Sequence, residues 1–239
     1  MLAIYKKEIK SFFHTMEAYI AISVFFIING LILWYIPSSY NIIHNKQASL
    51  LPFFTISPWV LLVLIPAITM KMINTEITQG TSIILFTKPI NVGEIIIGKF
   101  LASLTIGITS IMPSLIFVYG IYQTSHPVGN IDIGELIGSY TGIILLITLY
   151  SSIGLFCSSV FKNNMIALIS TIMIILFLYF GVNFLGDYYN NSILEYLSIS
   201  YHYQSISRGI IDSRDMLYFL SLTICFLYFT IKILHNKKI

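Results

Sequence analysis

The residues of this chain that could do chemistry are few, and the most suggestive run is Gly93-Glu94-Ile95-Ile96-Ile97-Gly98-Lys99-Phe100. Its glycines and lysine are spaced almost as in the loop that cradles the phosphates of a nucleotide. Phe100, however, stands where that loop carries the serine or threonine that holds magnesium, and no strand precedes the run. We therefore interpret residues 93–100 as a helix entering a membrane, with Lys99 at the lipid headgroups, and expect no ATP site in this chain.

The other reactive side chains form no recognisable catalytic or metal-binding set. Cys157 and Cys225 both fall inside apolar runs, so they predict neither a disulfide nor a zinc site, and buried free cysteine usually behaves as a small hydrophobe. No serine is spaced with a histidine as a nucleophile with its base, and His202 alone predicts neither a ligand nor a base. We expect no catalytic residue, no cofactor and no metal in this chain.

Six long apolar stretches must position whatever the chain does carry. They cover roughly 18–36, 58–74, 99–122, 134–160, 165–186 and 215–234. Each approaches or exceeds the ~20 residues with which a helix crosses a ~30 Å hydrocarbon layer. The hydrophobic fraction of 56% and the mean hydropathy of +0.85 also exclude an ordinary soluble domain. The sequence predicts an all-α, polytopic membrane protein whose residues 1–239 form one transmembrane domain with six helices.

The basic residues predict the orientation of these spans. With the N-terminus inside, ten lysines share its side of the membrane: Lys6, Lys7, Lys10, Lys71, Lys88, Lys99, Lys162, Lys232, Lys237 and Lys238. Only Lys46, Arg208 and Arg214 lie on the other side. Because bases accumulate in cytoplasmic loops, we expect both termini and the segment 72–98 to be cytoplasmic, and the loop 187–214 to be outside. Since the bases follow the membrane boundary, the net charge of +3 does not predict nucleic-acid binding.

The first 17 residues are amphipathic. Apolar residues recur at helical spacing (Leu2, Tyr5, Ile9, Phe12, Phe13 and Met16), and basic ones cover the rest. This pattern predicts a helix over 1–17 that lies in the cytoplasmic interface. A simple charged leader before the first span is the alternative.

Five of the ten acidic residues have an ordinary explanation at helix ends. The pairs Asn91 with Glu94, Asp132 with Glu135 and Asp212 with Asp215 resemble capping boxes, and Ser57-Pro58 predicts the start of another helix. No acid, base or histidine remains near the middle of a span. This absence argues against a proton-driven or sodium-driven carrier, because such carriers use intramembrane ionisable groups.

Three features within the spans concern helix packing. Gly134, Gly138 and Gly142 are spaced by four, which favours close approach of another helix, within the subunit or across a dimer, although glycine is also simply common in membrane helices. Pro113 predicts a kink in the third span. Asn29 is expected to hydrogen-bond between helices, with a role on a translocation path as the alternative.

Residues 58–101 carry a motif of known membrane proteins. The motif begins with an acid, Glu76, which is followed by the pair Gly80-Thr81 and by Leu85. It continues with Thr87 and Pro89, two positions apart, and ends with the pair Gly98-Lys99. With the segment 201–219, this pattern resembles the permease subunits of type-2 ABC exporters, and within them the gliding-motility (GldF) permeases of Bacteroidota. The copper-maturation permeases of the nitrous-oxide reductase system are close relatives. Thr75, Ile77, Thr78 and Ile83 depart from the pattern and make the loop less charged.

The resemblance implies a function and partners. It implies a permease of the bacterial inner membrane, without an ATP site, whose loop 72–98 docks on a separate cytoplasmic ABC ATPase (GldA-like) that binds Mg-ATP. The ATPase-coupling residues would be Glu76, Gly80, Thr81, Ile83, Ile84, Leu85, Phe86 and Pro89. Further partners would be an accessory membrane protein (GldG-like) or a second permease copy, and membrane lipid.

Several functions stay open at this point. ATP hydrolysis by the partner would be coupled either to export or to mechanical work in gliding. The alternatives are a copper-maturation permease, a drug or sodium exporter permease, and a non-transporting mechanical transducer. An intramembrane enzyme is disfavoured because the catalytic residues it would need are missing.

Overall fold

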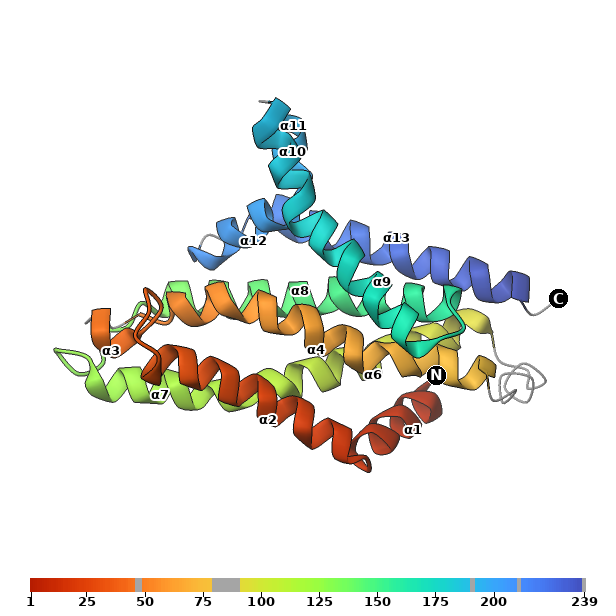
Figure 1. The fold of residues 1–239 in the computed structure, drawn as a ribbon, viewed down its shortest axis with the longest axis horizontal. Helices are drawn as coiled ribbons and strands as arrows, with labels where there is room; N and C mark the ends of the chain where they lie inside the picture. The colour runs from red at the N-terminus through yellow and green to blue at the C-terminus, as the bar shows by residue number, and fades with distance from the viewer. Residues whose placement is uncertain (46–48, 79–90, 190–191, 210–211, 238–239) are drawn as a thin grey trace.

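The computed structural model describes residues 1–45, 49–78, 91–189, 192–209 and 212–237, and every regular element in these ranges is a helix (Figure 1). Six of the helical stretches are long and apolar enough to cross a membrane. They cover Ala18–Tyr35, Leu51–Thr78, Val92–Thr124, Ile133–Val160, Asn164–Tyr189 and Ser213–Asn236. The chain is therefore an all-α, multi-pass membrane protein, as the apolar stretches predict.

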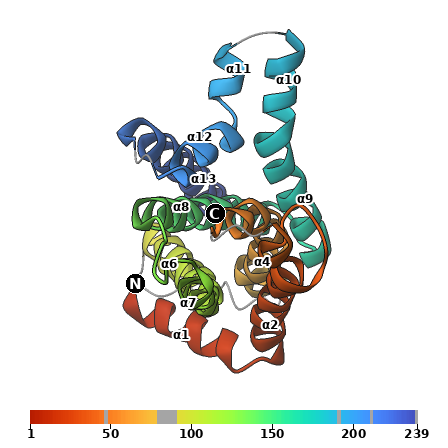
Figure 2. The same cartoon turned by 90° about the vertical axis from the view of Figure 1, so that its left-hand side faces the viewer.

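The N-terminal helix is shorter than the sequence indicates. Helix α1 (Leu2–Phe13) ends before Thr15, whose backbone is extended, and α2 (Met16–Gly30) begins directly afterwards and continues as η1 (Leu31–Tyr35). The Thr15 hydroxyl donates a hydrogen bond to the Phe12 carbonyl and so satisfies the end of α1. Helix α1 packs against α6 and runs obliquely along the lower side of the bundle in Figure 2. The expected single helix over 1–17 is thus two helices that meet at a bend.

The second span begins earlier than expected. Helix α4 runs over Leu51–Thr78, with Pro58 and Pro66 inside it. The interpretation of Ser57-Pro58 as a helix start is wrong, because the Ser57 hydroxyl donates to the Phe53 carbonyl within the helix. Pro58 has no N–H to donate to the Phe54 carbonyl, which instead accepts a 2.6 Å hydrogen bond from the Tyr203 hydroxyl, so the helix tolerates this proline in its interior.

The third span is interrupted near Pro113. Helix α6 (Val92–Ile111) passes through η2 (Met112–Ser114) into α7 (Leu115–Thr124). The Ser114 hydroxyl donates to the Ile111 carbonyl and lies 2.9 Å from the Tyr140 hydroxyl of α8. The interruption therefore has polar partners inside the bundle.

Helix α8 (Ile133–Val160) is the most enclosed of the six candidate spans, and α4, α6, α12 and α13 all pack against it. The remaining helices are α3 (Ile42–Asn45), α9 (Asn164–Leu176), η3 (Phe177–Gly181), α10 (Val182–Tyr189), α11 (Ser192–Tyr196), α12 (Ile199–Ser207) and α13 (Ser213–Lys237). Helices α10 and α11 form a hairpin that projects from the bundle in both views (Figures 1 and 2). Helix α11 ends at Tyr196 and α12 begins at Ile199, so residues 193–201 do not form one continuous helix.

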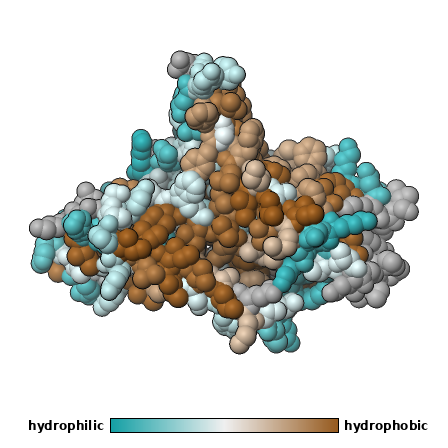
Figure 3. Space-filling view, in the orientation of Figure 1, coloured by the Kyte–Doolittle hydropathy of each residue, from teal (hydrophilic) through white to brown (hydrophobic). Residues whose placement is uncertain are grey.

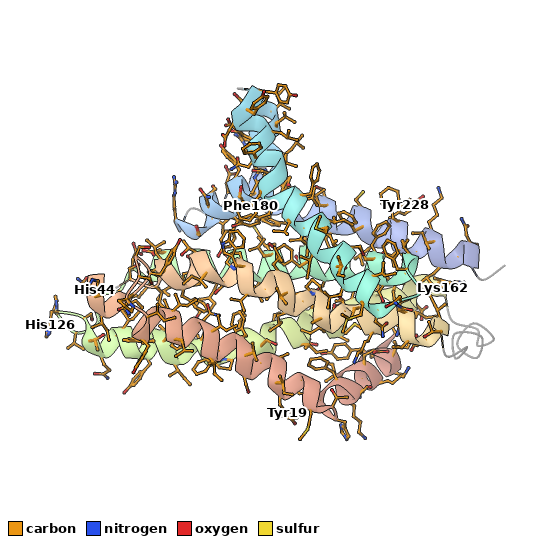
Figure 4. The ribbon with its side chains drawn as sticks, in the orientation of Figure 1. Tyr19, His44, His126, Lys162, Phe180 and Tyr228 are labelled. Atoms are coloured by element: carbon orange, nitrogen blue, oxygen red, sulfur yellow. The ribbon has the colours of Figure 1, made fainter. Side chains whose placement is uncertain are left out.

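The two ends of the bundle differ. The N-terminus, the end of α13 and Lys162 lie at one end, which we call the α1 end, whereas His44 and His126 lie at the opposite end (Figures 1 and 4). Apolar residues dominate the middle of the visible face, and hydrophilic residues gather towards the ends (Figure 3). This distribution suits a bundle whose helices cross a hydrocarbon layer.

Candidate functional site

Lys99 is a buried lysine at the α1 end of the bundle. Only 2% of it is exposed, and its ammonium lies 2.8 Å from Glu8 Oε1 and 2.9 Å from Glu76 Oε2. It also donates a 2.6 Å hydrogen bond to the Met72 carbonyl oxygen. The expectation that Lys99 reaches the lipid headgroups is wrong, because carboxylates from two other helices surround its ammonium inside the protein.

Lys7 is the fourth charged residue beside Lys99, Glu8 and Glu76. Its ammonium lies 2.8 Å from Glu76 Oε1 and 3.8 Å from Glu8 Oε1. Burial lowers the pKa of Lys7, but the hydrogen bond and charge of Glu76 and the charge of Glu8 outweigh this effect, so the pKa is raised overall. We call Lys7, Glu8, Glu76 and Lys99 the four-charge cluster. Its two positive and two negative charges compensate one another, and the buried ammonium of Lys99 in particular requires the carboxylates beside it.

The four-charge cluster joins three elements that are far apart in the sequence. Lys7 and Glu8 belong to α1, Glu76 lies near the end of α4, and Lys99 lies two turns into α6. Glu76 and Lys99 therefore flank the segment 79–90, which lies outside the described residues. That segment holds the other expected coupling residues: Gly80, Thr81, Ile83, Ile84, Leu85, Phe86 and Pro89.

The last turns of α4 are also held by α8. The backbone N–H groups of Ile73 and Asn74 donate to the Ser158 hydroxyl at 3.2 and 3.1 Å, and this hydroxyl donates to the Met70 carbonyl at 2.9 Å. A side chain that inserts into the backbone hydrogen-bond ladder is a recognised cause of helix bending. The part of α4 that leads to Glu76 is thus fixed by side chains of α8 and α6.

The glycines of α8 lie at different distances from other elements. A Cβ atom added to Gly138 would lie 2.7 Å from Gly209 Cα and 2.8 Å from the Ile206 carbonyl oxygen. A Cβ atom at Gly142 would lie 3.3 Å from side-chain atoms of Ile206 and Tyr203. At Gly134 the nearest atom would be Asp132 Oδ1, at 3.2 Å. A Cβ atom at Gly138 or Gly142 would therefore meet α12 or the turn that follows it.

A second polar group lies between α12 and α13, at some distance from the four-charge cluster. His202 and Asp215 are both buried, with His202 Nδ1 2.6 Å from Asp215 Oδ1 and Nε2 2.7 Å from the Tyr196 carbonyl oxygen. A carbonyl can only accept, so Nε2 carries hydrogen, and a further proton lies between Nδ1 and Oδ1. The ring also stacks on Tyr218 at 4.0 Å between centroids. His202 is therefore not the isolated histidine that its sequence context suggests, and Asp215, expected as part of a capping pair with Asp212, is bonded to His202.

Among the described residues, the other polar side chains within the spans form no recognisable catalytic or metal-binding site. The Asn29 side chain donates to the Phe25 carbonyl of its own helix, so the expected interhelical bond is not formed by this donor. Across the described ranges, no group of three or more His, Cys, Asp or Glu residues could hold a metal ion. The four-charge cluster is consequently the strongest candidate for a functional site.

Comparison with known families gives a match over nearly the whole chain. Residues 2–235 match the family described as ABC-2 family transporter protein. No curated protein matches the chain.

Proposed function

Since the chain belongs to the ABC-2 family of transporter proteins, we propose that it is the permease subunit of a complex powered by a separate ABC ATPase. The α1 end would face the cytoplasm of a bacterium and the α10–α11 hairpin the outside of the inner membrane. The excess of lysines on the side of the termini supports this orientation. The whole chain, residues 1–239, would act as one transmembrane domain, and Mg-ATP would bind only to the partner.

The observation that carries this proposal is the position of the four-charge cluster. Glu76 and Lys99 flank the segment 79–90 and are joined to each other at 2.9 Å. Force applied to that segment by an ATPase would reach α4 and α6 together, and through Glu8 and Lys7 it would also reach α1. Because packed helices move as units, closure of two ATPase subunits would be converted into a tilt of these helices.

We further propose that the protein is the gliding-motility member of this group, with a GldA-like ATPase and a GldG-like accessory protein. The support is the sequence pattern from Glu76 to Lys99 and the segment 201–219. Export and mechanical work on envelope proteins use the same coupling step. Purification of the assembled complex and identification of its subunits by mass spectrometry would test the assignment, and an unrelated set of partners would refute it.

The coupling step itself is tested with Phe86, the largest apolar side chain of the run Ile83-Ile84-Leu85-Phe86. Truncating an aromatic anchor of an interface commonly costs ~2 kcal/mol, which is about 30-fold in affinity. We expect Phe86→Ala to reduce recovery of the ATPase in a pull-down at matched permease expression. Phe184→Ala is the control, because Phe184 is 68% exposed on α10 at a distance from the proposed contact. Equal recovery with both variants would place the ATPase contact elsewhere.

A further inference from the structure

Two side chains hold the junction between α11 and α12. His202 Nε2 donates a 2.7 Å hydrogen bond to the carbonyl of Tyr196, the last residue of α11. The Tyr218 hydroxyl, from α13, donates a 2.6 Å hydrogen bond to the next carbonyl, that of Leu197. His202 is itself joined to α13 through Asp215, at 2.6 Å. Both bonds therefore fasten the second arm of the projecting α10–α11 hairpin to α13.

The pair His202 and Asp215 is enclosed by the protein. Each of the two residues is only 5% exposed. The other four histidines of the chain are exposed: His14, His44, His126 and His235. The Asp215 Oδ2 atom is also buried, and it has no hydrogen-bond partner among the described residues. The hydrogen-bonding needs of the pair must therefore be met by the protein atoms around it.

The two contacts of His202 require two ring hydrogens or their equivalent. The Tyr196 carbonyl only accepts, so Nε2 must carry a hydrogen. An ionised carboxylate also only accepts, so the contact between Nδ1 and Asp215 Oδ1 needs a second hydrogen. A neutral imidazole has one. The pair consequently holds one proton more than a neutral His202 and an ionised Asp215, whichever of the two atoms carries it.

Loss of this proton would break one of the two bonds. If Nε2 kept the remaining hydrogen, the lone pairs of Nδ1 and Asp215 Oδ1 would face each other at 2.6 Å. If the hydrogen moved to Nδ1, the lone pair of Nε2 would face the Tyr196 carbonyl at 2.7 Å. Two acceptors at such a distance repel, and the buried Oδ2 has no partner that could compensate among the described residues. The side chains must then move apart.

The aromatic groups around the ring do not replace His202 as the titrating group. Tyr196, Tyr201 and Tyr218 contact it, with ring centroids 6.3, 5.5 and 4.0 Å away. Phenols ordinarily titrate near ~10, well above the ~6.5 of imidazole. These three side chains therefore keep their hydrogens over the range in which a histidine changes its charge.

The charged groups beside the pair come from three elements. Glu195 lies at the end of α11, and Arg214 precedes Asp215 in α13. From α8, Glu135 contacts Gly209, beyond the end of α12. Such neighbours change the pH at which a group titrates, but they do not change the number of hydrogens that the two bonds of His202 need.

We propose that His202 and Asp215 form a proton-binding site that fastens the α10–α11 hairpin to α13. With the proton bound, both contacts of the His202 ring are made. When the pH on the hairpin side rises and the proton leaves, one contact opens and the end of α11 gains mobility. This site lies between α12 and α13, away from the four-charge cluster, and does not depend on the proposed ATPase coupling.

The experiment follows a nitroxide label at Leu197→Cys on the full chain in lipid nanodiscs. Leu197 lies at the junction and its side chain is 52% exposed. Cys225→Ser removes the exposed native cysteine, whereas Cys157 is buried. Label mobility is measured by electron paramagnetic resonance between about pH 5 and about pH 9, a range that spans the titration of imidazole. We expect mobility to rise with pH in one reversible transition that involves about one proton.

Nuclear magnetic resonance of the protein with ¹⁵N-labelled histidine measures the proton itself. The His202 signals are assigned by their absence in His202→Gln. We expect them to report the loss of a ring hydrogen at the same midpoint as the mobility transition. A His202 ring that titrates while the label stays equally mobile would overturn the link to the hairpin.

Three variants separate the proton site from a merely structural contact. His202→Gln should abolish the mobility transition. Asp215→Asn should also abolish it but keep the label immobile, because an amide N–H can donate to Nδ1 of a neutral His202 while Nε2 still donates to Tyr196. His44→Gln, which removes an exposed histidine at the end opposite the α1 end, is the matched control and should keep the transition (Figure 4). A wild-type protein without a transition, or a transition that persists in His202→Gln or Asp215→Asn, would overturn the proposal.

Discussion

Lys99 and Glu8 are 91 positions apart in the sequence, yet the ammonium of Lys99 lies 2.8 Å from Oε1 of Glu8. This ion pair ties the amphipathic α1 to the membrane helix α6. Together with Glu76 it makes the position of α1 dependent on the ends of α4 and α6. The four-charge cluster is therefore expected to stabilise the whole α1 end rather than a single contact.

Removal of Lys99 is predicted to be strongly destabilising. Lys99→Gln would leave Glu8 and Glu76 facing each other without their buried cation, and breaking a buried pair on one side costs about 3 kcal/mol or more. We expect a lower midpoint in thermal unfolding of the detergent-solubilised protein. Lys7→Gln should cost under ~1 kcal/mol, because the Lys7 side chain is 59% exposed. Equal losses in the two variants would contradict the central role of Lys99.

The same lysine should not affect nucleotide binding. Residues 93–100 lack the hydroxyl that would hold magnesium, and Lys99 is occupied by Glu8, Glu76 and the Met72 carbonyl. The purified chain is expected to bind no ATP, and Lys99→Ala should leave the nucleotide affinity of the assembled complex unchanged. Isothermal titration with a non-hydrolysable ATP analogue measures both. Lost affinity in a complex shown to be intact would mean that Lys99 contacts nucleotide.

Gly138→Ala is predicted to disturb the contact between α8 and the end of α12. The added methyl group would lie 2.7 Å from the backbone of Gly209, which cannot move aside as a flexible side chain would. Overpacking of this kind typically costs 1–3 kcal/mol. Gly134→Ala is the control, since its methyl group would meet only Asp132 Oδ1 at 3.2 Å. Thermal unfolding should separate the two variants, and indistinguishable midpoints would show that the backbone at Gly209 yields.

His202→Phe is predicted to destabilise the packing of α12 on α13. Phenylalanine keeps the stacking on Tyr218 but removes the partner of the buried Asp215 carboxylate. An uncompensated buried charge costs several kcal/mol, so the double variant His202→Phe with Asp215→Leu should recover part of the loss. Thermal unfolding of the two single variants and the double variant completes the cycle. Additive losses would show that the two residues are not coupled.

The orientation is tested by cysteine labelling in intact cells. A cysteine at Ser192, at the start of α11, should react with a membrane-impermeant maleimide added from outside, because the projecting hairpin is expected to be external. A cysteine at Ser82 should react only after the cells are opened. The reverse pattern would invert the bundle and remove the argument for ATPase docking at the α1 end.

Hydropathy was sufficient to predict the six spans and the all-helical fold, because each span must satisfy its backbone within the helix. It placed the start of α4 too late, since Pro58 is typical of a helix start and the bond from Ser57 to Phe53 is not visible in the pattern. It also placed Lys99 at the membrane surface. The error has a physical cause: a lysine near the end of a span is usually solvated, and the sequence does not show that Glu8 and Glu76 converge on it.

The contact between His202 and Asp215 could not be predicted from local sequence patterns either. The two residues are 13 positions apart, beyond the spacing of neighbours on one helix, and meet only because α12 folds back on α13. The spacing of Gly134, Gly138 and Gly142 indicated a contact surface but could not identify the partner, which lies near Ile206 and Gly209. Local patterns thus predicted the elements, whereas pairings between distant helices required the structure.

The burial of Lys99 has a consequence for the biosynthesis of the protein. A ribosome adds roughly 5–20 residues per second from the N-terminus, so both carboxylates of the four-charge cluster are made before the lysine that needs them. Glu76 precedes Lys99 by 23 positions, an interval of roughly one to five seconds. When the third span leaves the ribosome, the carboxylates of Glu8 and Glu76 that pair with Lys99 are already synthesised. The order of residues along the chain therefore spares the insertion machinery from having to accommodate an unpaired lysine.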